Sequence, residues 1–197
     1  MDALENIMTR RSVRRFLDKP IPDEALETIL RAGMAGPSCV NARDWSFLVT
    51  RDPVIMNQMA DANGRPADPL KRAALGILVL GDLERAFQPA PDYWVIDGAI
   101  AAQNMILAAH ALGIGSVWLG TWPQMDRVNR QREAFCLPDT VIPHSVIAFG
   151  YPDTEAEKTP PAPPKPDDMP AVPPKGTPPQ NMEKGAFEPG RIHVDRR

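Results

Sequence analysis

The sequence predicts one α+β domain in which helices cover a β-sheet, and three observations support this prediction. The chain has 197 residues, of which 43% are hydrophobic, so it is long enough for one full core and short for two. Within residues 1–151, segments with the apolar spacing of helices are interspersed with short apolar runs typical of buried strands. After Tyr151 the composition changes abruptly and proline dominates. We therefore expect the domain to end near residue 151.

Five segments have helical patterns. The second follows a Lys-Pro-Ile-Pro breaker, and Asp23 is expected to cap it. The fourth is the strongest pattern and is apolar on nearly all sides, which is typical of a helix in a core or in a subunit interface. The predicted helices span residues 2–11, 23–31, 53–62, 93–112 and 125–135.

Four short apolar runs predict strands. They lie at residues 45–50, within 73–81, at 117–120 and at 143–150. Between the fourth helix and the third strand, Gly113 is expected to end the helix in a left-handed conformation. The Gly-Ile-Gly-Ser sequence at this point resembles a dinucleotide-binding loop only superficially. A Rossmann loop follows a strand and precedes a helix, whereas these glycines follow a helix and precede a strand.

Residues 152–197 are expected to form an extended arm rather than a second domain. They hold 12 of the 23 prolines and too few apolar residues to form a core. Near their end, residues 187–194 bring Phe187, Ile192 and Val194 close together. We expect this arm to wrap a partner subunit; the alternative is a free disordered tail.

Charge and composition exclude several classes of protein. A net charge of −3 gives no overall basic field for nucleic acid. Residues 1–11 lack the apolar stretch of a signal peptide, so a cytoplasmic location is expected. Residues 98–125 carry no charge and could span a bilayer of ~30 Å. Their glycine break and strand-like end favour a buried helix followed by a strand, so no membrane segment is predicted. Cys39 and Cys136 are expected to be reduced and buried.

No metal site or protein nucleophile is predicted. His110, His144 and His193 do not have the spacing of metal ligands, and the first two are interpreted as histidines satisfied within the core or at its edge. The sequence contains no serine-hydrolase elbow, Walker loop or Cys–His motif.

Two short segments are candidates for ligand binding. Arg10 and Arg14 would share one face if the first helix continued through them, and arginine binds phosphate oxygens in bidentate fashion. Ser12 adds a hydroxyl between them; the alternative is a solvated basic helix end. The loop at residues 37–41 (Pro-Ser-Cys-Val-Asn) could present polar groups to a ligand, although an ordinary turn would have the same composition.

In their order along the chain, these motifs resemble the FMN-dependent nitroreductase family. Each motif is weak alone, and the resemblance rests on their sequence of appearance over residues 1–152 and 191–197. The motifs are Arg-Arg-Ser-Val-Arg-Arg-Phe at residues 10–16, Pro-Ser-x-x-Asn at 37–41, Ala-Leu-Gly-Ile-Gly-Ser at 111–116, Trp-Leu-Gly at 118–120, Gly-Tyr-Pro at 150–152 and Arg-x-His at 191–193.

The resemblance implies an FMN-binding α/β sandwich with an antiparallel or mixed sheet, assembled as an intertwined homodimer with FMN at the interface. It implies that Arg10 and Ser12 meet the FMN phosphate and ribityl chain, with Arg11 beside them, and that Arg14 approaches flavin N1. Reduced flavin is negative there, so a fixed cation would stabilise it. The remaining implied contacts are Ser38 and Asn41 from the partner subunit, the backbone of Trp118, Leu119 and Gly120 near N5, and Arg191 at the phosphate.

The implied activity is a two-step transfer in which NAD(P)H reduces the flavin, leaves, and is replaced by a small organic acceptor such as a nitroaromatic or a quinone. Arg43-Asp44 replaces a common Gln-Pro pair, Leu119 replaces a glutamate of some members, and Arg197 replaces a common Trp. Two alternatives remain: a dehalogenase or flavin-breaking enzyme of the same fold, and a non-enzymatic flavin-binding scaffold whose proline-rich arm recruits partners.

Overall fold

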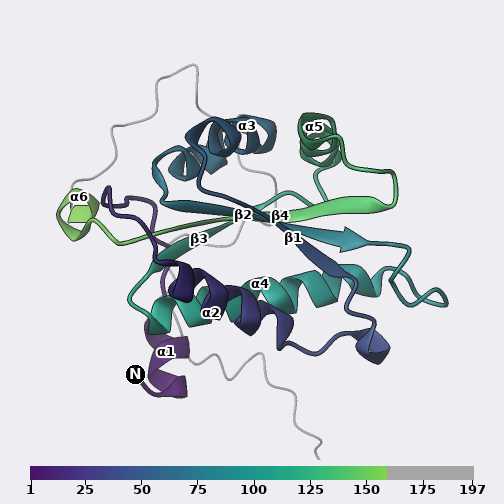
Figure 1. Cartoon of the computed structure of the whole chain (residues 1–197), viewed down its shortest axis with the longest axis horizontal. Coiled ribbons are helices and arrows are strands. Elements are labelled where there is room, and N and C mark those ends of the chain that lie inside the picture. Colours follow the sequence, from purple (N-terminus) through teal and green to yellow (C-terminus); the bar gives the residue numbers. More distant parts are fainter. Residues whose placement is uncertain (159–197) are drawn as a thin grey trace, which may run out of the picture. The chain divides into compact units, whose positions relative to one another are not determined.

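A four-stranded sheet lies between two layers of helices in the computed structural model, which describes residues 1–158 (Figure 1). The strands are β1 (Trp45–Thr50), β2 (Leu75–Asp82), β3 (Gly115–Gly120) and β4 (Val141–Gly150). Their order is β1-β2-β4-β3, and every neighbouring pair is antiparallel. The prediction of an α+β fold is therefore confirmed. Of the two sheet types expected, antiparallel or mixed, the sheet of the named strands is antiparallel. β3 is an edge strand, which matters for the site.

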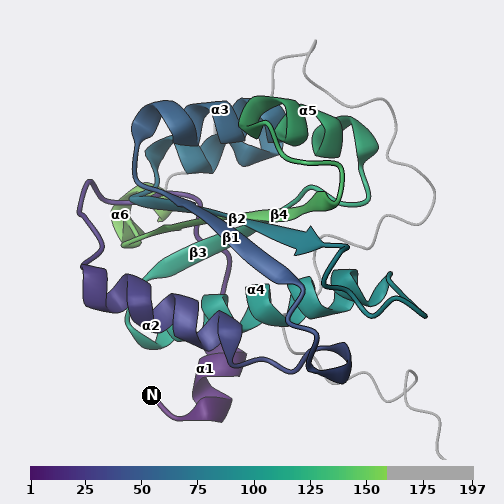
Figure 2. The ribbon, with the colours of Figure 1, turned by 45° about the vertical axis from the view of Figure 1, so that its right-hand side comes forward.

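The helices divide between the two faces of the sheet. Figure 2 shows α2 (Asp23–Met34) and α4 (Tyr93–Ala111) under one face, and α3 (Pro53–Asn63) and α5 (Met125–Phe135) over the other. The 3₁₀ helix η2 (Arg65–Arg72) packs against α3 and was not predicted.

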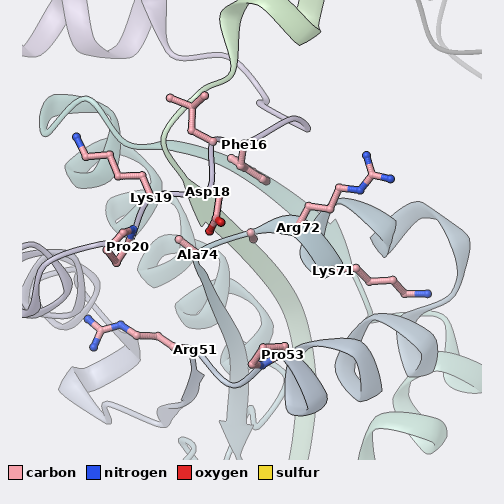
Figure 3. A pocket seen from close by; sticks show the side chains of 11 residues that line it. Phe16, Asp18, Lys19, Pro20, Arg51, Pro53, Lys71, Arg72 and Ala74 are labelled. Atoms are coloured by element: carbon pink, nitrogen blue, oxygen red, sulfur yellow. The ribbon is translucent and has the colours of Figure 1, made fainter.

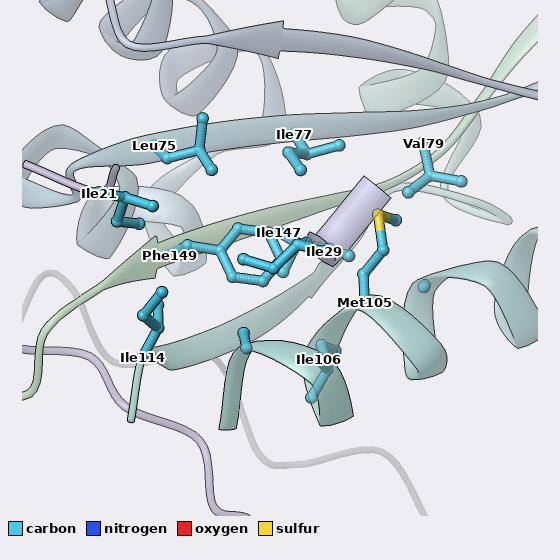
Figure 4. Close-up of a cluster of buried hydrophobic side chains, with 12 residues drawn as sticks. Ile21, Ile29, Leu75, Ile77, Val79, Met105, Ile106, Ile114, Ile147 and Phe149 are labelled. Carbon is cyan, nitrogen blue, oxygen red and sulfur yellow. The ribbon is translucent and has the colours of Figure 1, made fainter. Parts of the chain in front are cut away.

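Each face of the sheet has its own core, because successive residues of β2 point to opposite faces. The core on the side of α2 and α4 is drawn in Figure 4. Its larger members are Ile21, Ile29, Leu75, Ile77, Val79, Met105, Ile106, Ile114, Ile147 and Phe149. The core on the side of α3 and α5 includes Met56, Met59, Leu70, Leu78, Val146 and Ala148.

Helix α4 buries one side and leaves apolar residues on the other. Ala102, Met105 and Ala109 are fully buried against the sheet. Tyr93 and Ile96 are 44% and 52% exposed in the isolated chain. The apolar residues on nearly all sides of this helix therefore form two faces. One face packs in the core, and the other is exposed in the isolated chain.

The first helix differs from the prediction. Helix α1 (Ala3–Thr9) begins after Asp2, whose side chain accepts a hydrogen bond from the Glu5 N–H, and it ends before Arg10. Arg10 and Arg14 therefore do not share a helix face. The predicted helix fails there because the backbone from Ser12 onward bonds to the sheet edge instead, and a short helix has little stability of its own.

Other local expectations also need correction. Helix α2 is preceded by Pro22 at the N-cap position, so Asp23 is its first residue and not its cap, and its side chain pairs with Arg51. Both cysteines are free, but neither is buried as predicted, because Cys39 is partly exposed and Cys136 is exposed. Within the predicted extended arm, Thr154–Lys158 forms the short helix α6.

The remaining predictions about the arm, including Arg191 and His193, lie outside the described residues. Gly113 has φ +73°, as expected for the end of α4. Among residues 1–158, no helix is long and apolar enough to cross a membrane.

Candidate functional site

The arginine-rich segment is pinned to the edge of β3. Ser12 pairs with Ser116 as a parallel bridge, and the Val13 N–H donates to the Ser116 carbonyl at 2.9 Å. A Cβ on Gly115 would lie 2.9 Å from the Val13 Cβ, so only glycine allows this approach. The segment is thus held as an added partial strand.

The same segment is also fastened to the end of β4. The Leu17 N–H donates to the Tyr151 carbonyl at 2.8 Å, and the Asp153 N–H donates to the Arg15 carbonyl at 3.0 Å. Phe16 forms an antiparallel bridge with Pro152. Backbone bonds at both ends therefore fix residues 12–17 in place.

A pocket of about 270 Å³ lies beside this segment. Arg10 lines it and is half-buried. Neither Arg10 nor Arg14 forms an ion pair with any residue between 1 and 158, so both charges are available to an anion. The full lining is Met1, Arg10, Arg11, Val13, His110, Gly113, Ile114, Gly115, Ser116, Pro152 and Thr154. Guanidinium and hydroxyl groups together suit a phosphate.

Further along β3, the backbone of Trp118 and Gly120 faces the open side of the sheet. In an antiparallel pair, the N–H and C=O groups of successive residues point alternately toward and away from the partner strand. The Thr121 N–H donates to the His144 carbonyl, so the groups of Gly120 point away from β4. A Cβ added to Gly120 would meet no atom within 4 Å. This edge therefore offers backbone donors beside open space.

The carbonyl of Gly120 is already occupied by two side chains that the sequence did not identify. Asn63 Nδ2 donates to it at 3.2 Å and Arg127 at 2.8 Å. Asn63 is buried, and its Oδ1 accepts the Thr121 hydroxyl at 2.7 Å. These contacts fix the carbonyl of Gly120, and the N–H of the same residue faces away from β4. No short motif joins Asn63, Gly120 and Arg127, so only the fold brings them together.

Trp118 is 42% exposed and stacks on His144, with ring centroids 5.9 Å apart. His144 Nε2 lies 3.1 Å from the Val95 carbonyl, so this nitrogen carries the proton and donates it. Nδ1 then accepts the Ser145 hydroxyl at 3.0 Å. Burial lowers the pKa of His144 to about 4, so the ring is neutral at physiological pH. His144 is thus the satisfied core histidine that was predicted.

The loop with Ser38 and Asn41 is anchored on helix α4. The Cys39 N–H donates to both carboxylate oxygens of Asp97, at 2.9 and 3.1 Å. Val40 and Asn41, within the 3₁₀ helix η1 (Cys39–Asn41), have φ of 45° and 60°. A left-handed backbone is costly for a β-branched residue, and Val40 is 70% exposed. Such strain is often found at ligand-binding loops.

Two buried carboxylates lie beneath this loop. Asp44 and Asp97 are both inaccessible to solvent or nearly so. Burial, together with the nearby charge of Asp97, raises the pKa of Asp44 to about 6. The side chain of Asp44 is turned into the protein, so it does not face the same way as the exposed Arg43 next to it.

One chain does not bring all the predicted residues together. Asn6 bonds to Leu107 near the end of α4, whereas the loop bonds to Asp97 near its beginning. At 1.5 Å per residue, roughly 15 Å of helix separates these attachments. Figure 1 shows α1 and η1 at opposite ends of α4. Residues 10–14 and β3 therefore form one part of the candidate site, and Ser38 and Asn41 form another.

A larger pocket of about 550 Å³ lies elsewhere and contains none of the predicted site residues. Although four of its lining residues are basic, Arg51 pairs with Asp23, and Lys71 pairs with Asp61 and Asp68. Figure 3 shows the charged ends of Arg51 and Lys71 diverging from one another. The pocket is therefore not a better candidate for an anion.

Comparisons with known proteins agree on one family. A model described as the nitroreductase family matches residues 7–79 and 66–151. A protein of Methanothermobacter thermautotrophicus, provisionally named NADH dehydrogenase/NAD(P)H nitroreductase, is 43% identical over 77% of this chain and 78% of its own length.

Two solved structures are similar as well. One, from Bacteroides thetaiotaomicron and provisionally given the same name, is 41% identical with a TM-score of 0.71, covering 77% of this chain and 87% of that one. The other is the NADPH:FMN oxidoreductase of Vibrio harveyi complexed with NAD⁺. It is 28% identical with a TM-score of 0.70, covering 81% of this chain and 73% of that one.

Proposed function

Because the chain belongs to the nitroreductase family, we propose that it is an enzyme that binds FMN and transfers electrons from NAD(P)H to a small organic acceptor such as a nitroaromatic or a quinone. The observation that carries this proposal is the continuous edge of β3. Arg10 and Arg14, which form no ion pair within residues 1–158, lie beside its beginning, and an outward-facing N–H with open space beside it lies at Gly120.

The residues present fit FMN. Its phosphate requires cations and hydrogen-bond donors, which Arg10, Arg11 and Ser12 supply next to the 270 Å³ pocket. From Ser116 to Gly120, four residues of strand span about 13 Å. That length suits a ligand whose anionic end and flat ring are joined by a short chain.

When bound, FMN supplies the redox chemistry by accepting hydride from NAD(P)H and reducing the acceptor. The protein binds and orients it. Arg14 supplies a fixed positive charge, Gly120 an outward N–H held in position by Asn63 and Arg127, and Ser38 and Asn41 of a second subunit supply polar contacts. Arg191 would add a cation at the phosphate. No protein nucleophile is required, in agreement with the sequence.

The purified protein is expected to be yellow and to release FMN on heating, identified by chromatography. NADH or NADPH added without air should bleach the flavin, and a nitroaromatic or quinone should restore its colour. Recovery of FAD or of no flavin would contradict the proposal. Bound FMN that neither nicotinamide bleaches would favour the scaffold alternative. If bleaching is followed by release of halide from an aromatic compound, a dehalogenase of the same fold is favoured. If it is followed by breakdown of the flavin, a flavin-breaking enzyme of the same fold is favoured.

We also propose a homodimer, since one chain separates the two parts of the site and leaves apolar surface on two helices. Leu4, Ile7 and Met8 of α1 are 75%, 51% and 60% exposed, and α4 exposes Tyr93 and Ile96. A second copy would cover these faces and complete the site.

Light scattering at low concentration should therefore give the mass of two chains for the FMN-loaded protein. A stable monomer that retains FMN would contradict both the dimer and the two-subunit site. The cytoplasmic location and the wrapping of the partner by the arm stay predictions. Removing residues 159–197, which leaves Pro152, Asp153 and Thr154 beside the arginine segment, and measuring FMN content would test the arm.

A further inference from the structure

Arg43 contacts both polar residues of the loop at residues 38–43. Its backbone N–H donates to Ser38 Oγ at 3.0 Å, and its Nε donates to Asn41 Oδ1 at 3.3 Å. Its φ of 52° turns the chain so that one residue makes both bonds. Neither bond was expected from the sequence, where Arg43 was noted only as a departure from the family pattern.

These two bonds determine which atoms of Ser38 and Asn41 remain for a ligand. Arginine has only donors, so the amide atom that meets it must be the oxygen. Asn41 therefore presents its NH₂ group outward. Ser38 Oγ accepts from a backbone N–H, so its own hydroxyl proton stays available to donate. The loop then offers a ligand hydrogen-bond donors from both side chains.

The loop has the rigidity that such orientation requires. Asp97 holds the Cys39 N–H with both oxygens, so the loop is fixed to α4 between Ser38 and Asn41. Asp44 is fully buried, so its side chain lies away from exposed Arg43. Arg43 forms no ion pair with any residue in the part of the chain that the structure describes.

We propose that Arg43 is a positioning residue, which orients Ser38 and Asn41 as donors toward the flavin of the partner subunit. This inference rests on the proposed function. The flavin ring system carries several acceptors, at its two carbonyl oxygens and at N1 and N5, and a single N–H donor at N3. Donors matched to those acceptors bind the ring, and they stabilise the reduced form more because it carries more negative charge.

A double-mutant cycle on FMN affinity tests this role. Arg43→Met keeps the length of the side chain and the backbone bond to Ser38 but removes the Nε donor. Asn41→Gly removes the amide and tolerates the positive φ. Each single variant should weaken FMN binding roughly three- to tenfold, the loss of one hydrogen bond. In the Asn41→Gly background, Arg43→Met should add little, because Arg43 acts through Asn41.

Two further measurements distinguish a loss of side-chain orientation from a loss of folding stability and from the removal of a positive charge. The thermal midpoint of the apo-protein should stay near that of the parent, while the flavin midpoint potential shifts to more negative values in both single variants. Arg31→Gln removes an exposed arginine of α2 and should change neither FMN affinity nor potential. The proposal is overturned if Arg43→Met weakens FMN binding by the same factor in the parent and in the Asn41→Gly variant, or does not weaken it in the parent. A parent protein that binds no FMN contradicts the proposed function instead.

Discussion

Arg10→Ala and Arg14→Ala should each weaken FMN binding by roughly ten- to a hundredfold, the value of a charge-assisted hydrogen bond. Both arginines lie on or beside the segment that is bonded to the edge of β3, and neither is neutralised by an ion pair within residues 1–158. Titration of FMN into each apo-variant measures the effect.

A matched control is Arg130→Ala, which removes an arginine of α5 whose partner is Asp126. That variant should bind FMN as the parent does. If Arg10→Ala and Arg14→Ala also bind as the parent does, the arginines are only a solvated basic segment and the phosphate site lies elsewhere.

Gly115→Val is expected to damage both the fold and the cofactor site. Its Cβ would lie 2.9 Å from Val13, so the segment that carries Ser12 must move away from β3. Overpacking of this kind costs roughly 1–3 kcal/mol of unfolding free energy. Urea denaturation of the apo-protein measures this cost, and FMN titration should show weaker binding.

Gly120→Val is the matched substitution on the same strand. A Cβ there meets no protein atom within 4 Å, so the apo-protein should be about as stable as the parent. FMN affinity should nevertheless fall, because the added methyl groups would occupy the space proposed for the flavin. Unchanged affinity would show that the ring does not lie against this edge.

Local sequence patterns were enough to predict the four strands and helices α2 to α5, but not η2, which contributes Leu70 to the core. The strand Trp45–Thr50 and the helix Met125–Phe135 begin and end where they were expected, because Pro53 follows the strand closely and Pro123 and Pro138 flank the helix. The first helix was predicted too long because its end depends on contacts with Ser116, more than 100 residues away. Local periodicity carries no information about such a contact.

The residues of the candidate site were predicted from the family resemblance. The resemblance named Gly120 but not the side chains that hold its carbonyl. Asn63 comes from α3 and Arg127 from α5, and neither belongs to a motif. Arg43 was visible only as an unusual residue, because its effect depends on a positive φ and on two bonds within the loop.

The attachment of residues 12–17 to both β3 and the end of β4 has a consequence for biosynthesis. The arginine segment is synthesised more than 130 residues before its backbone partners Tyr151 and Asp153. At typical translation speeds, the intervening chain takes on the order of ten seconds to synthesise. Until β3 and then the end of β4 have been made, the basic segment lacks its backbone partners. The arginine segment of the proposed cofactor site therefore acquires its structure long after it is made, and the proposed site can capture FMN only after Asp153 has been synthesised.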